Sequence, residues 1–512
     1  MRFLFVLLSI FGLAATSAAS ARAGLDPGAV EQAFFVTRHE GAVVAVERVT
    51  RSAGLVLGRM TLNSELDVGW TLAVSQAQEV SSYELSTRAS EEPEQTLRGK
   101  VSPAQQEVGE NASGADVGAM LADGVLFDQS IGMIEQLVRS ARASGARSLS
   151  VQRIIGRHPL VATVSFPTED RARIELGGRT YDLAVDAIGR ITAGQITDFG
   201  ITIERVESAP ETHFALRPRF AAPVGAPYTA EDVLIPAGEG RVLGGTLTIP
   251  KQLSGPVPTV VLITGLTQHD RNNGNAPSFR QLADAYARKG VAVLRVDDRG
   301  VGASTGDATT STTQDEAADV GAALAYLRVR EGIDAERLGL VGYSEGGLIA
   351  MMVAAQEPSL RAVVGLAAPA SGLAAAEYQL QYILEKDGSV PMGQRDAIVQ
   401  SELAGERAKP REGSFLQLDG AAFASRVRAP VLLVEGTTDR HVPPWAASEL
   451  TAALHVGGNP DVTTYLALGL NHLLLPDPDG RQSGWLFLPS FSLAPSVINV
   501  IVDWTASRLL SR

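Results

Sequence analysis

The stretch Leu-Gly-Leu-Val-Gly-Tyr-Ser-Glu-Gly-Gly-Leu-Ile, residues 338–349, decides how this chain folds. Its apolar start predicts a short β-strand, and the residues after Ser344 predict a helix that begins at once. Gly342 and Gly346 flank the junction and permit a tight turn because they carry no side chain. A serine on such a strand–turn–helix junction projects its hydroxyl, and the helix N-terminus favours negative charge beside it. The segment therefore predicts that Ser344 is a nucleophile.

A second Gly-x-Ser-x-Gly segment, residues 302–306, matches the same pattern without its context. No predicted strand leads directly into this segment, and a run rich in Thr follows it instead of a helix. Because the bare pattern has a real false-positive rate, the flanking strand and helix decide between the two serines. We interpret Ser304 as a loop residue.

Strand-like and helix-like segments alternate from about residue 230 to the C-terminus. The strands are almost continuously apolar, which is typical of a doubly wound, mostly parallel α/β sheet with helices on both faces. The interval 371–428 breaks the rhythm: it is helical and polar, and it predicts a cap over the site. The predicted strands are 260–263, 291–296, 338–341, 362–366, 431–434 and 462–466, and the predicted helices are 278–288, 314–328, 345–355, 446–454 and 496–510.

A serine nucleophile needs a base, and on a sheet of this type the base follows the nucleophile in a loop after a late strand. Only His441, His455 and His472 come after Ser344. His455 lies beside an amphipathic helix, and His441 is only two residues from the best candidate acid. We predict that His472, in the turn after strand 462–466, is the base.

The base in turn needs a carboxylate to orient it, and that acid is expected in the loop after strand 431–434. Glu435 and Asp439 both qualify by residue type. Glu435 stands at the end of the strand, where its side chain is expected to turn away from the site. Asp439 lies deeper in the loop and can reach an imidazole from the next loop, so we predict that it is the acid.

Two backbone N–H groups are expected to stabilise the oxyanion of a tetrahedral intermediate. One is predicted to come from Glu345, the residue after the nucleophile. The other is predicted to come from the loop after strand 260–263, from Leu266, with Thr267 as the close alternative.

Asp297, Asp298 and Arg299 follow the strand beside the nucleophile, and paired aspartates can indicate a metal site. We favour a structural role in which these side chains hold a loop. No cluster of His, Cys and Asp has the spacing of a metal site, and the sequence predicts neither a metal nor a cofactor.

Residues 24–208 predict a β-rich N-terminal domain whose role the sequence does not indicate. Short stretches of alternating polarity are separated by Gly-containing turns, which is typical of an antiparallel meander. One helix is predicted at 116–142, and the polar, acidic segment 91–114 predicts an exposed loop. A proline-containing linker, 209–229, is expected before the α/β region 230–512.

The N-terminus has the pattern of a secretory signal, with Arg2, an apolar run over 3–15 and small residues ending at Ala21 or Ala23. We expect residues 1–23 to be cleaved there and the protein to be periplasmic or secreted in a bacterium, without stable membrane insertion. The chain has 512 residues and no cysteine, which excludes thiol catalysis and disulfides. Its net charge of −13 argues against nonspecific nucleic-acid binding. Its oligomeric state is not indicated.

Together, the motifs at 293–306, 342–347, 436–443 and 470–472 resemble the α/β-hydrolase superfamily, in particular bacterial serine aminopeptidase-like and dienelactone hydrolase-like esterases. The resemblance covers about 230–512 and implies a triad of Ser344, Asp439 and His472. At 265–271, Leu, Thr and His stand where related sequences often carry Ser, Gly and Pro.

We therefore expect a serine hydrolase that cleaves carboxylic esters through an acyl-serine, acting on a small ester, acyl or peptide substrate. A peptidase, an amidase or a thioesterase with the same triad is the alternative within enzymes. The alternative outside enzymes is a periplasmic protein that binds a lipid or a peptide.

Overall fold

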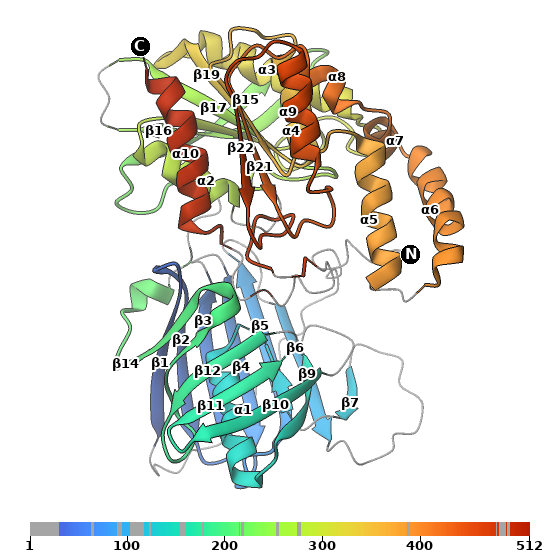
Figure 1. Cartoon of the computed structure of the whole chain (residues 1–512). Coiled ribbons are helices and arrows are strands. Elements are labelled where there is room, and N and C mark those ends of the chain that lie inside the picture. The colour runs from blue at the N-terminus through green and yellow to red at the C-terminus, as the bar shows by residue number, and fades with distance from the viewer. Residues whose placement is uncertain are drawn as a thin grey trace.

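The computed structural model shows two bodies, one β-rich and one of α/β type (Figure 1). The predicted signal segment, 1–23, lies outside the described residues. The structure describes residues 30–511 except 63–65, 90–94, 103–116, 122–123, 128, 154–159, 177–178, 215, 217–219, 252–254, 274–277, 387–389, 478, 481–487 and 489–491.

The N-terminal body is a curved sheet, mostly antiparallel, that confirms the predicted meander. Its elements are β1 (Glu31–His39), β2 (Ala42–Ser52), β3 (Leu55–Leu62), β4 (Leu66–Val74), β5 (Val80–Ala89), β6 (Gln95–Ser102), β7 (Val117–Leu121), β8 (Gly124–Leu126), helix α1 (Ile131–Ser144), β9 (Ser148–Arg153), β10 (Leu160–Thr168), β11 (Arg171–Leu176), β12 (Arg179–Val185), β13 (Ile191–Ile196), the 3₁₀ turn η1 (Thr197–Phe199) and β14 (Ile201–Val206). The order is β7-β6-β5-β4-β3-β2-β1-β14-β13-β12-β11-β10-β9-β8. The pairs β6–β7 and β8–β9 are parallel.

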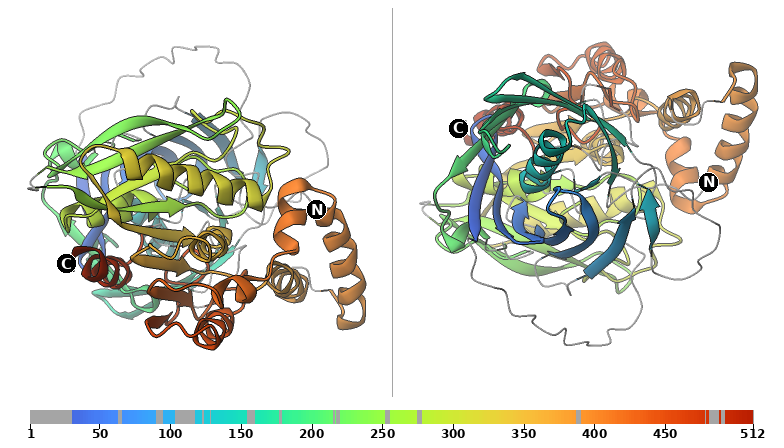
Figure 2. Two further views of the ribbon diagram at one scale, coloured as in Figure 1. Left: turned by 90° about the horizontal axis from the view of Figure 1, so that it is seen from above. Right: turned by 90° about the horizontal axis from the view of Figure 1, so that it is seen from below.

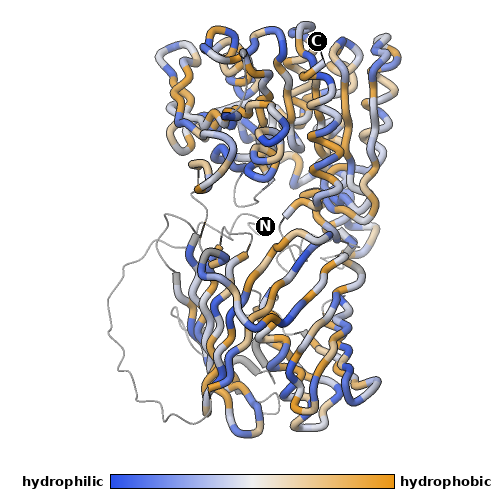
Figure 3. Tube along the Cα trace, turned by 90° about the vertical axis from the view of Figure 1, so that its left-hand side faces the viewer, coloured by the Kyte–Doolittle hydropathy of each residue, from blue (hydrophilic) through white to orange (hydrophobic). Residues whose placement is uncertain are grey.

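The sheet curls around helix α1, which fills its concave side (Figure 2, right). Apolar and polar residues alternate along the strands (Figure 3), and the inward residues join the buried face of α1 in one core. Gly132 lets the helix approach the sheet, since a Cβ there would lie 2.5 Å from Val49 and 2.7 Å from Trp70. The core of this body is therefore filled by its own helix.

Two predictions for this half were wrong in part. Residues 117–121 and 124–126 of the predicted helix form the edge strands β7 and β8, and the helix begins only at Ile131. Ser130 fixes that start because its hydroxyl accepts the Met133 N–H at 3.0 Å. Residues 95–102 of the predicted loop form β6, because pairing with β5 satisfies their backbone groups despite their polar side chains.

The second body is built on a sheet that confirms the predicted doubly wound α/β fold. Its strands are β15 (Tyr228–Pro236), β16 (Val242–Pro250), β17 (Val257–Ile263), β18 (Ala292–Val296), β19 (Ile333–Tyr343), β20 (Ala362–Leu366), β21 (Val431–Gly436) and β22 (Val462–Ala467), in the order β15-β16-β18-β17-β19-β20-β21-β22. From β18 to β22 all neighbours are parallel. The sequence did not indicate the antiparallel edge pair β15–β16; β15 begins inside the predicted linker, which also holds the 3₁₀ turn η2 (Glu211–Phe214).

Helices cover both faces of this sheet (Figure 1). The helices are α2 (Ser278–Arg288), α3 (Thr313–Val329), α4 (Glu345–Ala354), α9 (Ala446–Val456) and α10 (Pro495–Leu510). Helices α2 and α10 share a core with Val260, Leu262 and Val341, whereas α3, α4 and α9 share a second core with Val261 and Leu340. Neighbouring strand residues thus face opposite cores, which explains the continuous apolar runs.

The predicted cap is helical, with α5 (Gly372–Lys386), α6 (Met392–Arg407), α7 (Pro410–Leu416) and α8 (Gly420–Ala424) between β20 and β21. Helices α5 and α6 project from the side of the sheet (Figure 1). They enclose a small apolar core of their own around Leu384, Val399, Leu403 and Leu416. None of the described helices is both long enough and apolar enough to cross a membrane.

The two bodies share direct contacts. The Gln129 side chain donates to the Leu488 carbonyl at 2.9 Å, and the Ser496 N–H and hydroxyl each lie 3.2 Å from the Glu40 carboxylate. The apolar core around α1 belongs to the same cluster of buried residues as the α2 and α10 face of the second sheet. The N-terminal body is thus packed against the α/β body.

Helix α4 approaches the sheet so closely that Gly346 tolerates no side chain. A Cβ there would lie 2.3 Å from the Thr264 carbonyl oxygen and 2.4 Å from that of Ile263, which are backbone atoms and cannot rotate away. Gly321 of α3 is different, because a Cβ there would meet nothing within 4 Å.

We expect Gly346→Ala to lower the free energy of unfolding by more than about 2 kcal/mol, because it overpacks a backbone contact. The matched control, Gly321→Ala, is expected to raise it by about 0.5–1 kcal/mol through helix propensity. Urea denaturation followed by circular dichroism measures both changes. Equal effects of the two substitutions would contradict the packing argument.

Candidate active site

Ser344 stands on a strained turn between β19 and α4. Its backbone has φ 56° and ψ −121°, a region that residues other than glycine rarely adopt. The Ser344 N–H donates to the Leu366 carbonyl at 2.8 Å, and the Gly347 N–H donates to the Ser344 carbonyl at 2.9 Å. A Cβ on Gly342 would lie 2.0 Å from the Gly346 carbonyl oxygen, so the turn requires glycine there. The backbone thereby fixes the position of the Ser344 hydroxyl.

The structure brings together Ser344, His472 and Asp439, the three residues predicted as nucleophile, base and acid. The Nε2 atom of His472 lies 3.1 Å from Ser344 Oγ, and its Nδ1 atom lies 2.7 Å from Asp439 Oδ2. Asp439 is fully buried and His472 is 6% exposed. This arrangement can pass a proton from the serine hydroxyl to the imidazole while the carboxylate holds the ring.

Asp439 is kept ionised by its neighbours. The N–H groups of His441 and Val442 donate to its Oδ1 atom at 2.7 and 2.9 Å. Burial opposes ionisation, but the charge and hydrogen bond of His472, with further help from His441 and Val442, outweigh it and hold the pKa of Asp439 below its usual value. The acid is therefore an anion aimed at the base.

The loop that carries His472 is shaped by Asn471 and Gly436. The Asn471 side chain accepts from the N–H groups of Leu473 and Leu475, at 2.9 and 3.2 Å, and closes a tight turn. A Cβ on Gly436, at the end of β21, would lie 2.2 Å from the Leu470 carbonyl oxygen. The two loops that carry acid and base thus touch through a glycine.

His441 is stacked on His472, a contact that the sequence did not reveal. The ring centroids are 4.6 Å apart and the planes differ by 11°. Burial, followed by the neighbouring charge of His472, lowers the pKa of His441 to about 3, so it stays neutral and cannot replace His472 as base. Gln379 of α5 lies 3.0 Å from its Nδ1 atom, which links the cap to this stack. His455 is exposed on α9.

Glu435 does not turn away from the site as predicted: its side chain is buried, with 1% exposure, and interacts with Asp439. Burial, followed by the charge of Asp439, raises the pKa of Glu435 well above its usual value of 4.5 and favours its neutral form. The Nδ1 atom of His472 is occupied by Asp439, at 2.7 Å. Of the two acids considered from the sequence, Asp439 is the one that contacts the base.

Of the two backbone donors predicted for the oxyanion, Glu345 follows Ser344 directly in the chain, and Leu266 follows Gly265 in the loop after β17. Among the described residues, neither the Glu345 N–H nor the Leu266 N–H donates to a protein acceptor. Gly265 brings the second loop close, since a Cβ there would lie 3.4 Å from the Ser344 Cβ atom. Thr267, the alternative, has φ 87°, so the loop turns sharply at that residue.

The aspartates after β18 hold loops, as predicted. Asp297 pairs with Arg271 at 2.7 Å, Asp298 accepts from the Thr264 hydroxyl at 2.5 Å, and Arg299 pairs with Asp319 at 2.8 Å. Ser304 is a loop residue whose hydroxyl donates to the Asp297 carbonyl at 2.7 Å. Within the described part of the chain, no group of three or more His, Cys, Asp or Glu side chains is placed to hold a metal.

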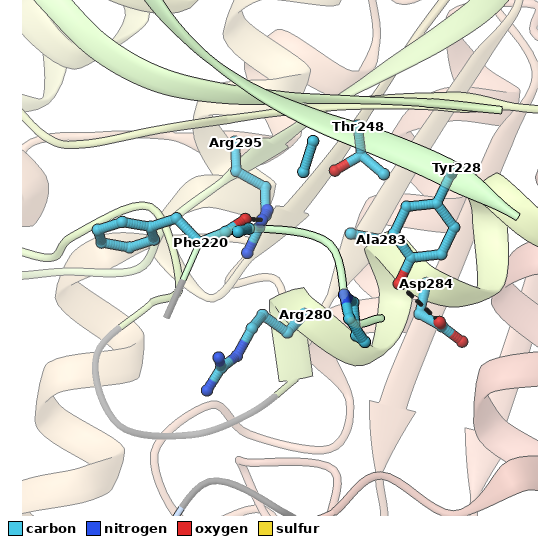
Figure 4. Close-up of a pocket in the computed structure, with 10 residues that line it drawn as sticks. Phe220, Tyr228, Thr248, Arg280, Ala283, Asp284 and Arg295 are labelled. Atoms are coloured by element: carbon cyan, nitrogen blue, oxygen red, sulfur yellow. Dashed lines mark hydrogen bonds between the residues drawn. The ribbon is translucent and has the colours of Figure 1, made fainter. Parts of the chain in front are cut away.

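A small pocket that is partly open to solvent lies between β15, β16 and α2, and none of the three predicted catalytic residues lines it (Figure 4). Arg295 is buried at this pocket. Burial, followed by the charges of Arg280 and Arg271, lowers the pKa of Arg295 to about 10. On the opposite wall the Tyr228 hydroxyl donates to Asp284 at 2.7 Å.

Comparisons with known proteins agree with this fold. Residues 239–412, about a third of the chain, match the family described as X-Pro dipeptidyl-peptidase (S15 family). Esterase FrsA from Yersinia pestis and from Yersinia pseudotuberculosis is 31% identical over 141 residues, which are 27% of this chain and 32% of each relative. The chain thus matches about a third of the length of these curated relatives.

Solved structures with similarity include an esterase from Pyrococcus furiosus, with a TM-score of 0.42 and 18% identity over 57% of this chain and 94% of that one. Est1E from Butyrivibrio proteoclasticus with bound ferulic acid has a TM-score of 0.39 and 17% identity, over 55% of this chain and 100% of that one.

The order of the parallel strands, the turn at Ser344 and the sequence matches identify the class of this protein. The chain is a member of the α/β-hydrolase superfamily.

The neutral Glu435 carboxyl predicts a pH effect on stability. Because the folded state keeps this proton to higher pH than the unfolded chain does, the group favours folding below about pH 4.5 and loses that contribution as the pH rises. Glu435→Gln is neutral at every pH, so its stability relative to wild type is expected to increase with pH, by up to about 1.4 kcal/mol per pH unit.

Urea denaturation of both proteins between about pH 5 and about pH 8 measures this difference. Glu331→Gln, at an exposed glutamate, is the control. A stability difference that does not change with pH would show that Glu435 ionises normally.

Proposed function

We propose that this protein is a serine esterase that cleaves carboxylic esters through an acyl-serine intermediate. The observation that carries the proposal is the continuous contact from Ser344 Oγ through His472 to the buried Asp439, with 3.1 Å and 2.7 Å between the respective atoms. The strained turn that presents the serine supports the same function, since strain of this kind clusters at active sites.

In the first step, Ser344 Oγ attacks the ester carbonyl carbon and His472 Nε2 takes the hydroxyl proton. The carbonyl oxygen becomes an oxyanion, which the N–H groups of Glu345 and of Leu266 or Thr267 stabilise. The bond between the carbonyl carbon and the leaving oxygen then breaks, and His472 gives its proton to the departing alkoxide. The products are an alcohol and the acyl-serine.

In the second step, water attacks the acyl-serine carbonyl and gives a proton to His472. The bond from the acyl carbon to Ser344 Oγ breaks, and His472 returns the proton to the serine. Asp439 holds the ring throughout and stabilises the imidazolium formed in each step.

A peptidase that releases residues from a peptide N-terminus is the second candidate, because residues 239–412 match the S15 family. Such an enzyme needs an anion that binds the substrate ammonium group. The carboxylates next to the site, Glu345, Glu435 and Asp439, are at most 1% exposed and face protein partners or stay protonated. This favours a neutral ester as substrate, in line with the esterase name of the FrsA relatives.

We expect Ser344→Ala to lower the hydrolysis of chromogenic esters, from acetyl to palmitoyl, by at least about 10³-fold. Ser304→Ala, which alters the serine of the other Gly-x-Ser-x-Gly segment, is the matched control and is expected to keep the activity of the folded protein. The chain-length profile of the wild type measures the size of the acyl pocket. A folded wild type that cleaves no ester but binds lipid would support the non-enzyme alternative.

Asp439→Asn is expected to lower kcat by about 10³–10⁴-fold, because an amide neither holds the correct tautomer nor stabilises the imidazolium. Steady-state kinetics on the best ester of the series measures the loss. If Glu435 replaces the missing acid, the remaining activity will fall again in the double variant with Glu435→Gln. A kcat of the double variant equal to that of the wild type would contradict the role of Asp439.

The choice between ester and peptide is tested with matched acyl groups. We expect kcat/KM for an ester to exceed that for the aminoacyl amide and the thioester of the same acyl group. Faster cleavage of an amide that carries a free N-terminus would favour the peptidase.

We also propose that the protein is exported, which rests on the signal pattern of residues 1–23. Cell fractionation of the intact chain, with N-terminal sequencing, is expected to find mature protein that begins after Ala21 or Ala23 outside the cytoplasm.

A further inference from the structure

A buried arginine of the cap contacts both sides of the predicted oxyanion site. Arg411 lies in the first turn of the short helix α7 and is 3% exposed. Its Nη2 atom lies 3.0 Å from the Glu345 carboxylate and 3.4 Å from the carbonyl oxygen of Gly265. These two residues belong to the two chain segments from which the oxyanion donors are expected.

The contact with Glu345 is a two-pronged ion pair in the interior. Arg411 Nε lies 3.1 Å from the same carboxylate oxygen that Nη2 contacts, and the Thr313 hydroxyl donates to the other oxygen at 2.5 Å. Glu345 is fully buried. Removal of its cation leaves a buried charge without compensation, which is costly.

The remaining arm of Arg411 is anchored on the body of the domain. Its Nη1 atom lies 2.6 Å from Glu316 of α3. Burial opposes the charge of Arg411, but the carboxylates of Glu345, Glu316 and Asp298 outweigh burial and raise the pKa of Arg411 above its usual value. The guanidinium is thus permanently charged and held from three sides.

The two donor segments follow the paired strands β17 and β19, and Gly346 of α4 packs against the Thr264 carbonyl, so the sheet sets part of their spacing. Glu345 follows the turn after β19, whereas Gly265 and Leu266 follow β17, so the N–H groups belong to loops far apart in sequence. Across them, Arg411 joins the side chain of one segment to the backbone of the other. Planar, forked donors such as guanidinium suit this task, and a lysine ammonium does not.

We propose that Arg411 is a positioning residue: it sets the distance between the two backbone donors of the oxyanion hole, so that catalysis depends on correct seating of the cap. This inference rests on the proposed function of the site. Arg411 does not touch the reacting atoms, and its effect is on the transition state, in which the oxyanion forms, rather than on substrate binding.

The competing explanation is that Arg411 only fastens the cap. Ser414, on the same helix, offers a control for fastening of the cap: its hydroxyl accepts the Thr313 N–H at 2.8 Å, donates to the Arg411 carbonyl at 2.8 Å and lies 3.1 Å from the Thr313 hydroxyl. It therefore reaches Glu345 only through Thr313, whereas Arg411 contacts Glu345 and Gly265 directly. Substitution of a residue that only fastens the cap is expected to lower stability, whereas substitution of a residue that positions the donors is expected to lower both stability and kcat.

The experiment compares Arg411→Lys, Glu345→Gln and Ser414→Ala in the full-length protein. Measured quantities are kcat and KM for the best ester, inhibition by an alkyl boronic acid, which mimics the tetrahedral intermediate at Ser344, and the fraction folded. For Arg411→Lys we expect kcat to fall by about 10–10²-fold, KM to change less than about threefold, and boronate inhibition to weaken by the same factor as kcat. Glu345→Gln is expected to show the same pattern, and Ser414→Ala is expected to keep kcat per folded molecule.

The proposal is overturned if Arg411→Lys keeps wild-type kcat, if its loss matches that of Ser414→Ala, or if KM rises while kcat and boronate inhibition stay constant. If Arg411→Lys does not fold, the same criteria are applied to Glu345→Gln. This substitution keeps the size of the side chain and weakens the ion pair with Arg411. If the wild type shows no hydrolysis that Ser344→Ala abolishes, the proposed function itself is contradicted, and this inference fails with it.

Discussion

The backbone conformation of Ser344 is the constraint around which the rest of the site is arranged. A φ of 56° at a residue with a side chain costs on the order of 1–3 kcal/mol and persists only where the surroundings enforce it. Here β20 binds the Ser344 N–H, and glycines at 342 and 346 let strand and helix approach within distances that exclude a Cβ. The packed sheet therefore determines where the hydroxyl stands, and the base meets it there.

Around this point the interior holds several ionisable groups, and each is stabilised in one charge state. Asp439 is an anion because His472 and two backbone N–H groups surround it, whereas Glu435 beside it keeps its proton. His441 is neutral although it stacks on the base. Burial makes any unpaired charge costly, so each group either has a partner or gives up its charge.

The cap packs on the α/β body through apolar residues such as Ala375, Leu418 and Ala424, and polar contacts join it to this site. Gln379 reaches His441, the Tyr378 hydroxyl donates to the Asp439 carbonyl at 3.2 Å, and Arg411 pairs with Glu345. The cap thereby touches the loop of Asp439 and the two segments of the predicted oxyanion donors. Movement of the cap would alter these segments together.

The sequence by itself determined the class of fold, because the apolar strands and helices of the second half repeat with local periods that hold in any context. It also singled out Ser344, Asp439 and His472, since the order of motifs along such a sheet fixes which loops meet at its edge. Local pattern did not predict structure that depends on strand pairing: residues 117–121 and 124–126 form strands at the edges of a sheet, and the pair β15–β16 was not predicted. Only the tertiary structure placed His441 on His472, kept Glu435 protonated and brought Arg411 of the cap to Glu345, because these contacts join segments far apart in sequence whose side chains carry no local periodicity.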